Sequence, residues 1–196
     1  MRIARRSSTW MERGRRVLWH CVEVPLVHEE VGIVIEPLRP EHWDEVRRIH
    51  REGIETGKAT FETDTAPSWH EWSQGHLEFG RIVAVRDGAV VGWAALTPVS
   101  DRCVYAGVAE VSIYIAGDAR GRGIGSMLMH ALIEESERND IWTLQAGIFA
   151  DNEHSIGLHE KCGFRIVGRR ERLGKLRGVW KDVLMLERRS ERVGMD

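Results

Sequence analysis

The residues that first suggest chemistry are three glycines at alternate positions, two of which follow arginines. They form the run Arg120-Gly121-Arg122-Gly123-Ile124-Gly125, between a strand-like stretch at 109–115 and a helical pattern over 126–138. Glycines let the backbone approach a ligand closely, and the start of the next helix presents unpaired amides and the positive end of its dipole. We expect an anion here, and the first hypothesis is a phosphate-bearing cofactor held by its pyrophosphate.

A carboxylate and a histidine are the candidates for proton transfer. Glu110 lies in an otherwise apolar strand, where an unpaired carboxylate is costly unless it faces a cleft. Burial raises the pKa of such a group toward the range in which it can take a proton from an ammonium; the alternative is an ion pair with an arginine at the strand edge. His159 can hold or release a proton near neutral pH, although a histidine on the inner face of a helix is also commonly a packing residue.

The elements that must position these residues follow from hydrophobic periodicity and from turn and capping signals. Ser68 with Glu71 has the spacing of a capping box, Asp87-Gly88 favours a tight hairpin, and Gly163 favours a helix C-terminus. The predicted strands are 31–38, 81–85, 89–96, 109–115, 141–149, 164–168 and 179–186. One predicted helix begins near Pro40, and three others cover 68–77, 126–138 and 152–162. This order predicts an α/β fold, α+β by stricter naming, with a mixed sheet of about seven strands flanked by helices.

Composition limits the classes of function. The chain has 196 residues, 42% hydrophobic and 30% charged, with a formal net charge of −2, which fits one globular domain and argues against nucleic acid as the main partner. No apolar run is long enough to span a bilayer, so we expect no membrane partner. Three widely spaced cysteines suggest neither disulfides nor zinc and favour a reducing cytoplasm.

The first 31 residues form a distinct segment, because six arginines in 2–16 face a single acid, Glu12. Val17 to Val27 is interrupted by polar residues and by proline, which leaves no apolar core for a signal peptide. We expect a disordered or loosely docked basic extension at 1–31, followed by one domain over 32–190. A basic arm that touches an anionic surface is the alternative.

The glycine run fits the [Q/R]-x-x-G-x-[G/A] signature of the GNAT acyl-CoA N-acyltransferases, and it lies between a strand and a long helix as in that family. Asn152, seven residues before His159 and followed by Gly163-Phe164, resembles the second landmark of the family. The sequence is more closely similar to the phosphinothricin and methionine sulfone acetyltransferase group, through Thr60-Phe61-Glu62-Thr63, Arg102 with Tyr105, and Leu158-His159-Glu160-Lys161. His159 stands where many relatives have tyrosine, which agrees with that group, whereas Cys103 and the N-terminal extension match no family element.

The resemblance implies the GNAT fold and an acetyl-CoA-dependent N-acetyltransferase that needs no metal. The implied reaction is direct attack, in a ternary complex, by the α-amine of a small amino acid or its phosphinic, sulfone or sulfoximine analogue, which suggests detoxification. It assigns catalysis to Glu110 as base and His159 as acid or second base. It also implies a bulged strand that splays from its neighbour and leaves amides free for the thioester oxygen.

The remaining site residues follow from the same resemblance. The cofactor is expected to contact Ser112, Ile113, Tyr114, Ile115, Arg120, Gly121, Arg122, Gly123, Ile124, Gly125 and Asn152. The acceptor is expected to contact Phe61, Arg102, Tyr105 and Tyr114, with the guanidinium binding the α-carboxylate. Trp180 lies where the family has a C-terminal hairpin that often packs across a twofold axis, so we expect a homodimer; a plain hydrophobic anchor is the alternative.

Two other functions stay open at this point. One is acetylation of a different amine, such as a protein N-terminus, an aminoglycoside or a polyamine. The other is a non-catalytic module that binds coenzyme A without turnover. The pairing of Glu110 with His159 argues against the second, and Arg102 beside Tyr105 favours an acceptor that carries a carboxylate.

Overall fold

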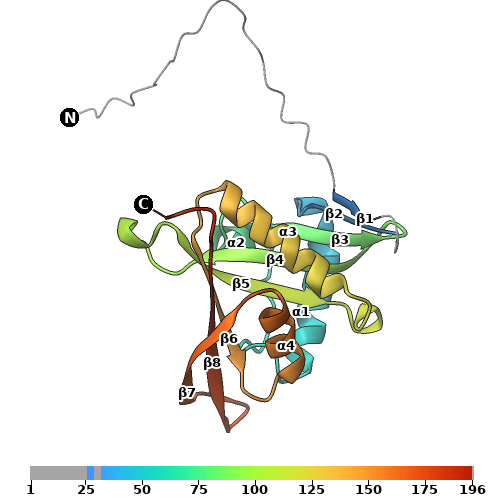
Figure 1. The fold of residues 1–196 in the computed structure, drawn as a ribbon. Coiled ribbons are helices and arrows are strands. Elements are labelled where there is room, and N and C mark those ends of the chain that lie inside the picture. The colour runs from blue at the N-terminus through green and yellow to red at the C-terminus, as the bar shows by residue number, and fades with distance from the viewer. Residues whose placement is uncertain (1–25, 29–31, 196) are drawn as a thin grey trace, which may run out of the picture.

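A computed structural model describes residues 26–28 and 32–195 (Figure 1). In this part of the chain eight strands form one sheet, in the order β1-β2-β3-β4-β5-β6-β8-β7. The strands are β1 (Leu26–His28), β2 (Ile33–Pro37), β3 (Ile82–Arg86), β4 (Ala89–Pro98), β5 (Val108–Ile115), β6 (Thr143–Phe149), β7 (Arg165–Leu176) and β8 (Val179–Arg189). The helices are α1 (Trp43–Glu55), α2 (Trp69–Gln74), α3 (Ile124–Arg138) and α4 (Glu153–Lys161).

The sheet is mixed, as predicted. β5 and β6 are parallel, and the other neighbouring strands are antiparallel. The strand beyond the expected seven is β1, which pairs with β2 from Leu26↔Ile35 to His28↔Ile33. The rest of the segment predicted as an extension, 1–25 and 29–31, lies outside the described residues.

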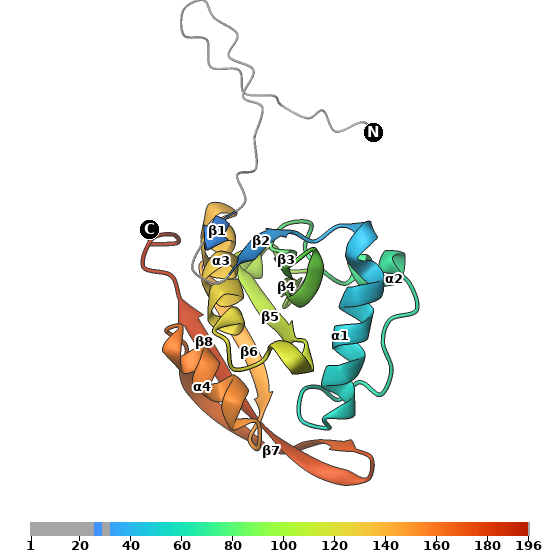
Figure 2. The ribbon, with the colours of Figure 1, turned by 90° about the vertical axis from the view of Figure 1, so that its right-hand side faces the viewer.

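Helices cover both faces of the sheet, with α1 and α2 on one side and α3 on the other (Figure 2). Their apolar sides pack into one core with the central strands; Ile49 of α1, Trp72 of α2 and Leu128 of α3 are all buried there. Trp93 of β4 lies among them and is almost fully buried. Burial of this apolar surface is the main force that holds the layers together. None of the helices in the described part is both long enough and apolar enough to cross a membrane.

Local signals placed two of these elements correctly. The Ser68 side chain accepts a hydrogen bond from the Glu71 amide at 3.2 Å and so caps α2. Asp87 and Gly88 both have positive φ, 52° and 79°, in the two-residue turn between β3 and β4. Positive φ at both central residues is what a type I′ hairpin turn requires.

The sheet opens between β5 and β6. The two strands pair only from Val108↔Thr143 to Glu110↔Gln145, although β5 continues to Ile115 and β6 to Phe149. The predicted divergence is therefore present, but the predicted bulge is not: β5 keeps an unbroken register with β4 from Pro98↔Ala109 to Gly92↔Ile115. The backbone groups of β5 beyond Glu110 are left unpaired on one side because β6 turns away from them.

The C-terminal hairpin is much longer than predicted. β7 runs to Leu176 and not to 168, and β8 runs to Arg189 and not to 186; a turn at Arg177 and Gly178, with φ of 48° and 84°, joins the two. Residues 165–173 are all exposed, so the buried-exposed alternation that marks a half-buried strand is missing. Pairing with β8, to which a two-residue turn joins it, makes this polar segment a strand.

Candidate functional site

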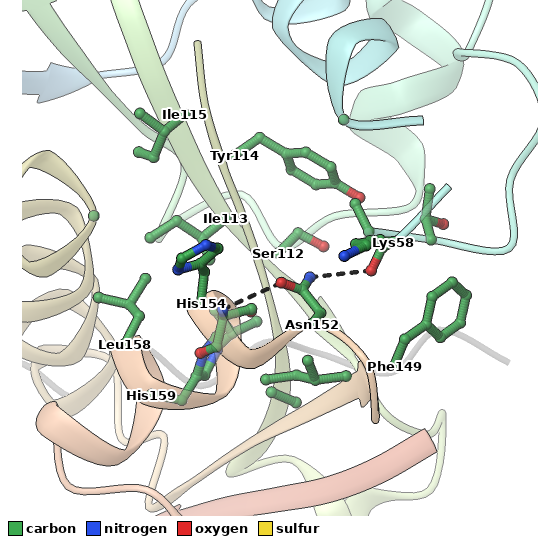
Figure 3. Close-up of a pocket in the computed structure, with 18 of the residues that line it drawn as sticks. Lys58, Ser112, Ile113, Tyr114, Ile115, Phe149, Asn152, His154, Leu158 and His159 are labelled. Atoms are coloured by element: carbon green, nitrogen blue, oxygen red, sulfur yellow. Dashed lines mark hydrogen bonds between the residues drawn. The ribbon is translucent and has the colours of Figure 1, made fainter. Parts of the chain in front are cut away.

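A cavity of about 1110 Å³ lies where β5 and β6 separate (Figure 3). Five parts of the chain form its wall: the loop after α1, the second half of β5, the glycine loop with the start of α3, the end of β6 with α4, and the inner side of β7 and β8. Most of the predicted site residues line it, namely Phe61, Glu110, Ser112, Ile113, Tyr114, Ile115, Arg120, Gly121, Gly123, Ile124, Gly125, Asn152 and His159.

The side chains of β5 divide between the two sides of the cavity. Ile113 and Ile115 point toward α3, whereas Ser112 and Tyr114 point toward the loop after α1 (Figure 3). This alternation is the ordinary period of a strand. One strand therefore offers an apolar side to a ligand at the glycine loop and a polar side to a ligand near Glu110.

Glu110 lies at the last residue of β5 that pairs with β6. Its Oε1 is 3.8 Å from the position that a Cβ on Gly147 would occupy, so the carboxylate crosses the neighbouring strand at a residue without a side chain. The residue is open to the cavity and to water, yet the surrounding protein raises the pKa of Glu110 by desolvation, while the positive charge of Arg170 acts in the opposite direction. A carboxylate with a raised pKa in a cavity is suited to proton transfer.

His159 is 2% exposed, and its ring lies edge-on to Phe164 at 4.9 Å between centroids. Its Nδ1 is 2.8 Å from the carbonyl oxygen of Ser155. A carbonyl only accepts, so Nδ1 carries the proton and Nε2 has a lone pair, for which the described residues supply no partner. Burial lowers the pKa of His159, and the resting imidazole is therefore neutral and able to accept a proton at Nε2.

The glycine loop has the features of an anion site. Gly121 and Gly123 have φ of 74° and 80°, a left-handed conformation that favours glycine, and nothing lies within 4 Å of where their Cβ atoms would be. Gly123 is the N-cap of α3 and offers no side chain to cap it, so the amides of the first turn stay available. Arg120 Nε donates to the carbonyl of Ile115 at 3.2 Å and fastens the loop to the end of β5. These features fit the pyrophosphate of a cofactor.

Gly125 has a packing role in addition to the predicted contact with the cofactor, and Arg122 lies outside the cavity wall. A Cβ on Gly125 would lie 3.0 Å from Leu158 Cδ2, so this glycine permits the close approach of α4 to α3 as well as lining the cavity. Arg122 is exposed and is not part of the cavity wall. The assignment of Arg122 to the cofactor therefore has no support from the cavity geometry.

Asn152 joins two sides of the cavity. Its Oδ1 accepts a hydrogen bond from the Ser155 amide at 3.3 Å and caps α4, and its Nδ2 donates to the Lys58 carbonyl at 3.0 Å (Figure 3). Phe61 fastens the same loop a second time, because its ring packs edge-on against Phe149 with 4.6 Å between centroids. The loop that would face the acceptor is thus held against the end of β6.

A network around Tyr114, which sequence reasoning missed, holds the other side of this loop. Tyr114 stacks on Trp93 at 4.8 Å, and its hydroxyl hydrogen-bonds Thr60; burial is the main cause of its raised pKa. His50 lies edge-on to Tyr114, and its Nε2 is 3.2 Å from Glu62 Oε2. The hydrogen bond from His50 lowers the pKa of Glu62. The sequence motif Thr60-Phe61-Glu62-Thr63 indicated part of this network, but no sequence pattern indicated that the buried His50 pairs with Glu62.

Arg102 and Tyr105 do not line the cavity of Glu110. Both are exposed in the loop between β4 and β5, where the guanidinium lies 5.6 Å from the centre of the tyrosine ring. Tyr105 lines a separate cavity of about 390 Å³ with Val108, Gln145 and Glu187. The single chain therefore does not bring the predicted carboxylate-binding pair to the predicted base.

Arg170 is a cavity residue that the sequence analysis did not single out. It belongs to the part of β7 that was not predicted as a strand. The turn at Arg177-Gly178 could have indicated that this segment is a strand. Pairing outward from the turn aligns residues 174–176 with 179–181 and so extends the hairpin toward Arg170. Within residues 26–28 and 32–195, no three histidine, cysteine, aspartate or glutamate side chains are grouped to hold a metal ion.

Comparisons with known proteins agree with this geometry. The model of the family described as Acetyltransferase (GNAT) matches residues 43–164. The chain is 35% identical over 136 residues to the phosphinothricin N-acetyltransferase of Streptomyces coelicolor, across 66% of this chain and 80% of that relative. It is 34% identical over 100 residues to the L-methionine sulfoximine/L-methionine sulfone acetyltransferase of Pseudomonas aeruginosa, across 51% of this chain and 58% of that relative.

A solved structure extends the similarity to the fold. It is a GNAT superfamily phosphinothricin acetyltransferase from Sinorhizobium meliloti in complex with AcCoA, and it matches with a TM-score of 0.73 and 27% identity, over 84% of this chain and 97% of that one. The chain belongs to the acetyltransferase (GNAT) family, as an acetyltransferase related to the phosphinothricin and methionine sulfoximine/sulfone enzymes.

Proposed function

We propose that this enzyme transfers acetyl from acetyl-CoA to the α-amine of a small amino acid or analogue, of the phosphinothricin, methionine sulfone or methionine sulfoximine type. The amine attacks the thioester carbonyl directly in a ternary complex: a C–N bond forms, the C–S bond breaks, and coenzyme A leaves as a thiolate that takes up a proton to become the free thiol. One observation carries the proposal: Glu110 and the glycine loop open onto the same cavity, at the point where β5 parts from β6. A base and an anion site on one cavity are what amine acylation by a phosphate-bearing thioester requires.

Acetyl-CoA supplies an acetyl group activated as a thioester. Gly121, Gly123 and the first turn of α3 hold its pyrophosphate, with Arg120 fastening the loop. Ile113 and Ile115 offer apolar contact along the way to the reacting group. The unpaired backbone amides of β5 beyond Glu110 are donors for an oxygen that becomes negative during transfer.

Glu110 takes the proton from the ammonium of the acceptor, directly or through a water. Its raised pKa supports this role, because a base with a pKa nearer neutrality takes a proton more readily. His159, which lines the same cavity, acts as a second group for proton transfer. Its neutral ring, with Nδ1–H donated to Ser155, supports acceptance of a proton at Nε2, whereas a role as acid requires prior protonation.

A thiol-release assay with a panel of amines tests the proposal. The panel contains methionine sulfone, methionine sulfoximine, phosphinothricin, ordinary amino acids, a polyamine, an aminoglycoside and a peptide with a free N-terminus. Turnover with small amino acids or their analogues is the expected result. Absence of turnover with every amine, together with measurable coenzyme A binding, would instead identify a non-catalytic coenzyme A-binding module.

The charges of the cavity wall favour a small zwitterion over a polycation. A cationic acceptor requires an acidic groove, but the wall has the carboxylates of Glu110 and Glu153 beside the cations of Lys58, Arg120, Lys161 and Arg170. Rapid turnover of the polyamine or the aminoglycoside, with none of the amino acids, would exclude our substrate assignment.

We also propose a homodimer that acts in detoxification in a reducing cytoplasm. The β7–β8 hairpin supports the dimer, because it exposes Ile166, Val167, Leu173, Val179 (62%) and Trp180 (52%). Large apolar side chains that are exposed along one hairpin support its role as an interface. The wide spacing of the three cysteines in the sequence supports the reducing compartment. Sedimentation of the Val179→Asp variant tests the dimer: a monomer is expected, and an unchanged mass would remove the hairpin from the interface.

A further inference from the structure

Four residues of neighbouring strands form a diagonal row that leads from Glu110 to Arg170, since the register pairs Glu110 with Gln145 and Gly147 with Met185. Glu110 of β5 reaches over Gly147 of β6, and a Cβ on Gly147 would lie 3.5 Å from Val183 Cγ1 of β8. Val183 is in turn the register partner of Arg170 in β7. Glu110, Gly147, Val183 and Arg170 all line the same cavity. A carboxylate and a guanidinium thus stand at the two ends of this row and line one cavity.

The guanidinium of Arg170 is not held by an ion pair or a hydrogen bond within the described part of the fold. Arg165 pairs with Glu187 at 2.9 Å, and Arg169 pairs with Asp182. Among the described residues Arg170 has no ion pair and no side-chain hydrogen bond, although it lies on the same strand. Its five N–H donors are therefore available to a ligand.

The other three cationic side chains of the cavity wall lie on elements other than β7. Arg120 is part of the glycine loop and donates to the Ile115 carbonyl. Lys161 is at the end of α4, and Lys58 is in the loop that Asn152 fastens. Arg170 is the cation whose charge acts on Glu110.

We propose that Arg170 binds the carboxylate of the amino-acid acceptor, in the role that the sequence suggested for Arg102. The proposal rests on the proposed function. A zwitterion between the two ends of the row places its ammonium at Glu110 and its carboxylate at Arg170. A guanidinium binds a carboxylate with two parallel hydrogen bonds, which fixes the orientation of the α-amine as well as adding affinity.

Steady-state kinetics with a matched pair of acceptors test this role. The pair is the best amino-acid acceptor found for the wild type and its carboxamide, which keeps the amine and the side chain but lacks the negative charge. The variants are Arg170→Met, Arg170→Lys, Arg102→Met and the control Arg165→Met. Arg165 is a good control because it is an exposed arginine on the same strand, and its partner Glu187 is four residues from Val183, on the same face of β8.

The expected result for Arg170→Met is at least a tenfold rise in KM for the acid, little change for the carboxamide and an unchanged KM for acetyl-CoA. Arg170→Lys should recover part of the loss, and Arg165→Met and Arg102→Met should resemble the wild type. Thermal melting checks the fold, which we expect to be intact because Arg170 is exposed.

Two results would overturn the inference while leaving the proposed function standing. Equal losses on the acid and the carboxamide would mean that Arg170 acts through the charge of Glu110 and not on the substrate. A selective loss on the acid with Arg102→Met, and none with Arg170→Met, would return the role to the β4–β5 loop. If the wild type acetylates no amine at all, the proposed function fails and the inference fails with it.

Discussion

Replacement of Glu110 by glutamine tests the centre of the proposed reaction. The amide keeps the shape of the side chain but cannot take a proton at neutral pH. Loss of a general base costs roughly 10²- to 10⁴-fold in rate. Glu110 is open to water, so a water can replace part of its function, and we expect the lower end: a fall in kcat/KM on the order of 10²-fold at pH 7, equivalent to about 2.7 kcal/mol.

The pH profile gives the more specific test. Desolvation raises the pKa of Glu110 above the usual glutamate range, and the wild-type rate should rise with pH as the carboxyl ionises and then level off. In Glu110→Gln this limb disappears, and the rate should climb about tenfold per pH unit until the acceptor's own ammonium ionises. The gap between the two enzymes should therefore narrow at high pH.

The assay is release of coenzyme A thiol across pH, with saturating acetyl-CoA and the best acceptor of the panel. Glu153→Gln is the matched control, since Glu153 also lines the cavity and loses the same charge. We expect that control to keep the wild-type profile. Full activity of Glu110→Gln with the wild-type pH dependence would refute the reasoning and place the base elsewhere.

Three further changes test the supporting residues. His159→Phe should lower kcat on the order of 10²-fold with acetyl-CoA affinity nearly unchanged, measured by kinetics and equilibrium titration; a collapse of the melting temperature instead would assign His159 to packing. Gly123→Ala should raise the KM for acetyl-CoA and lower the stability of the fold by roughly 1–2 kcal/mol, because φ of Gly123 is 80°. Gly75→Ala is the control, since Gly75 has a negative φ. Equal effects of the two substitutions would contradict the assignment of the glycine loop to an anion. Burial by itself would raise the pKa of Glu137, but hydrogen bonds from Ser190 and two arginines outweigh burial and lower the pKa. The ionised carboxylate should therefore stabilise the fold at pH values above the pKa of the unfolded chain. This stabilisation should be lost as the pH falls through the lowered pKa of the folded protein. Melting curves at several pH values should show that Glu137→Gln loses roughly 1–3 kcal/mol of unfolding free energy at neutral pH relative to the wild type, and less in acid. A difference that does not change with pH would contradict a contribution from ionised Glu137.

The fold class and many of its elements could be predicted because their signals are local. The apolar spacing of 126–138 predicts α3, Ser68 predicts the start of α2, and Asp87-Gly88 predicts the β3–β4 turn. Each of these depends on residues within a few positions of one another. The same is true of Gly121 and Gly123, whose left-handed backbone is a property of their own dihedral angles.

Pairing between strands and packing between separate elements decided the rest. β7 is polar and exposed, and it becomes a strand because β8 supplies its hydrogen-bond partners. The role of Gly125 in packing depends on Leu158, and the buried His50 depends on Glu62, neither of which periodicity can reveal.

The site shows the same division. Sequence alone proposed the glycine loop, Glu110, Asn152 and His159 as site residues from motif spacing, and all of them contribute to the cavity wall. The position of Arg170 in the cavity wall depends on the order of β5, β6, β8 and β7 in the sheet, whereas Arg102 lies in the β4–β5 loop outside that wall. The physical reason is that turns, caps and motifs depend on residues that are neighbours in the sequence. The distance between two side chains on different strands, in contrast, is determined only when the whole core packs.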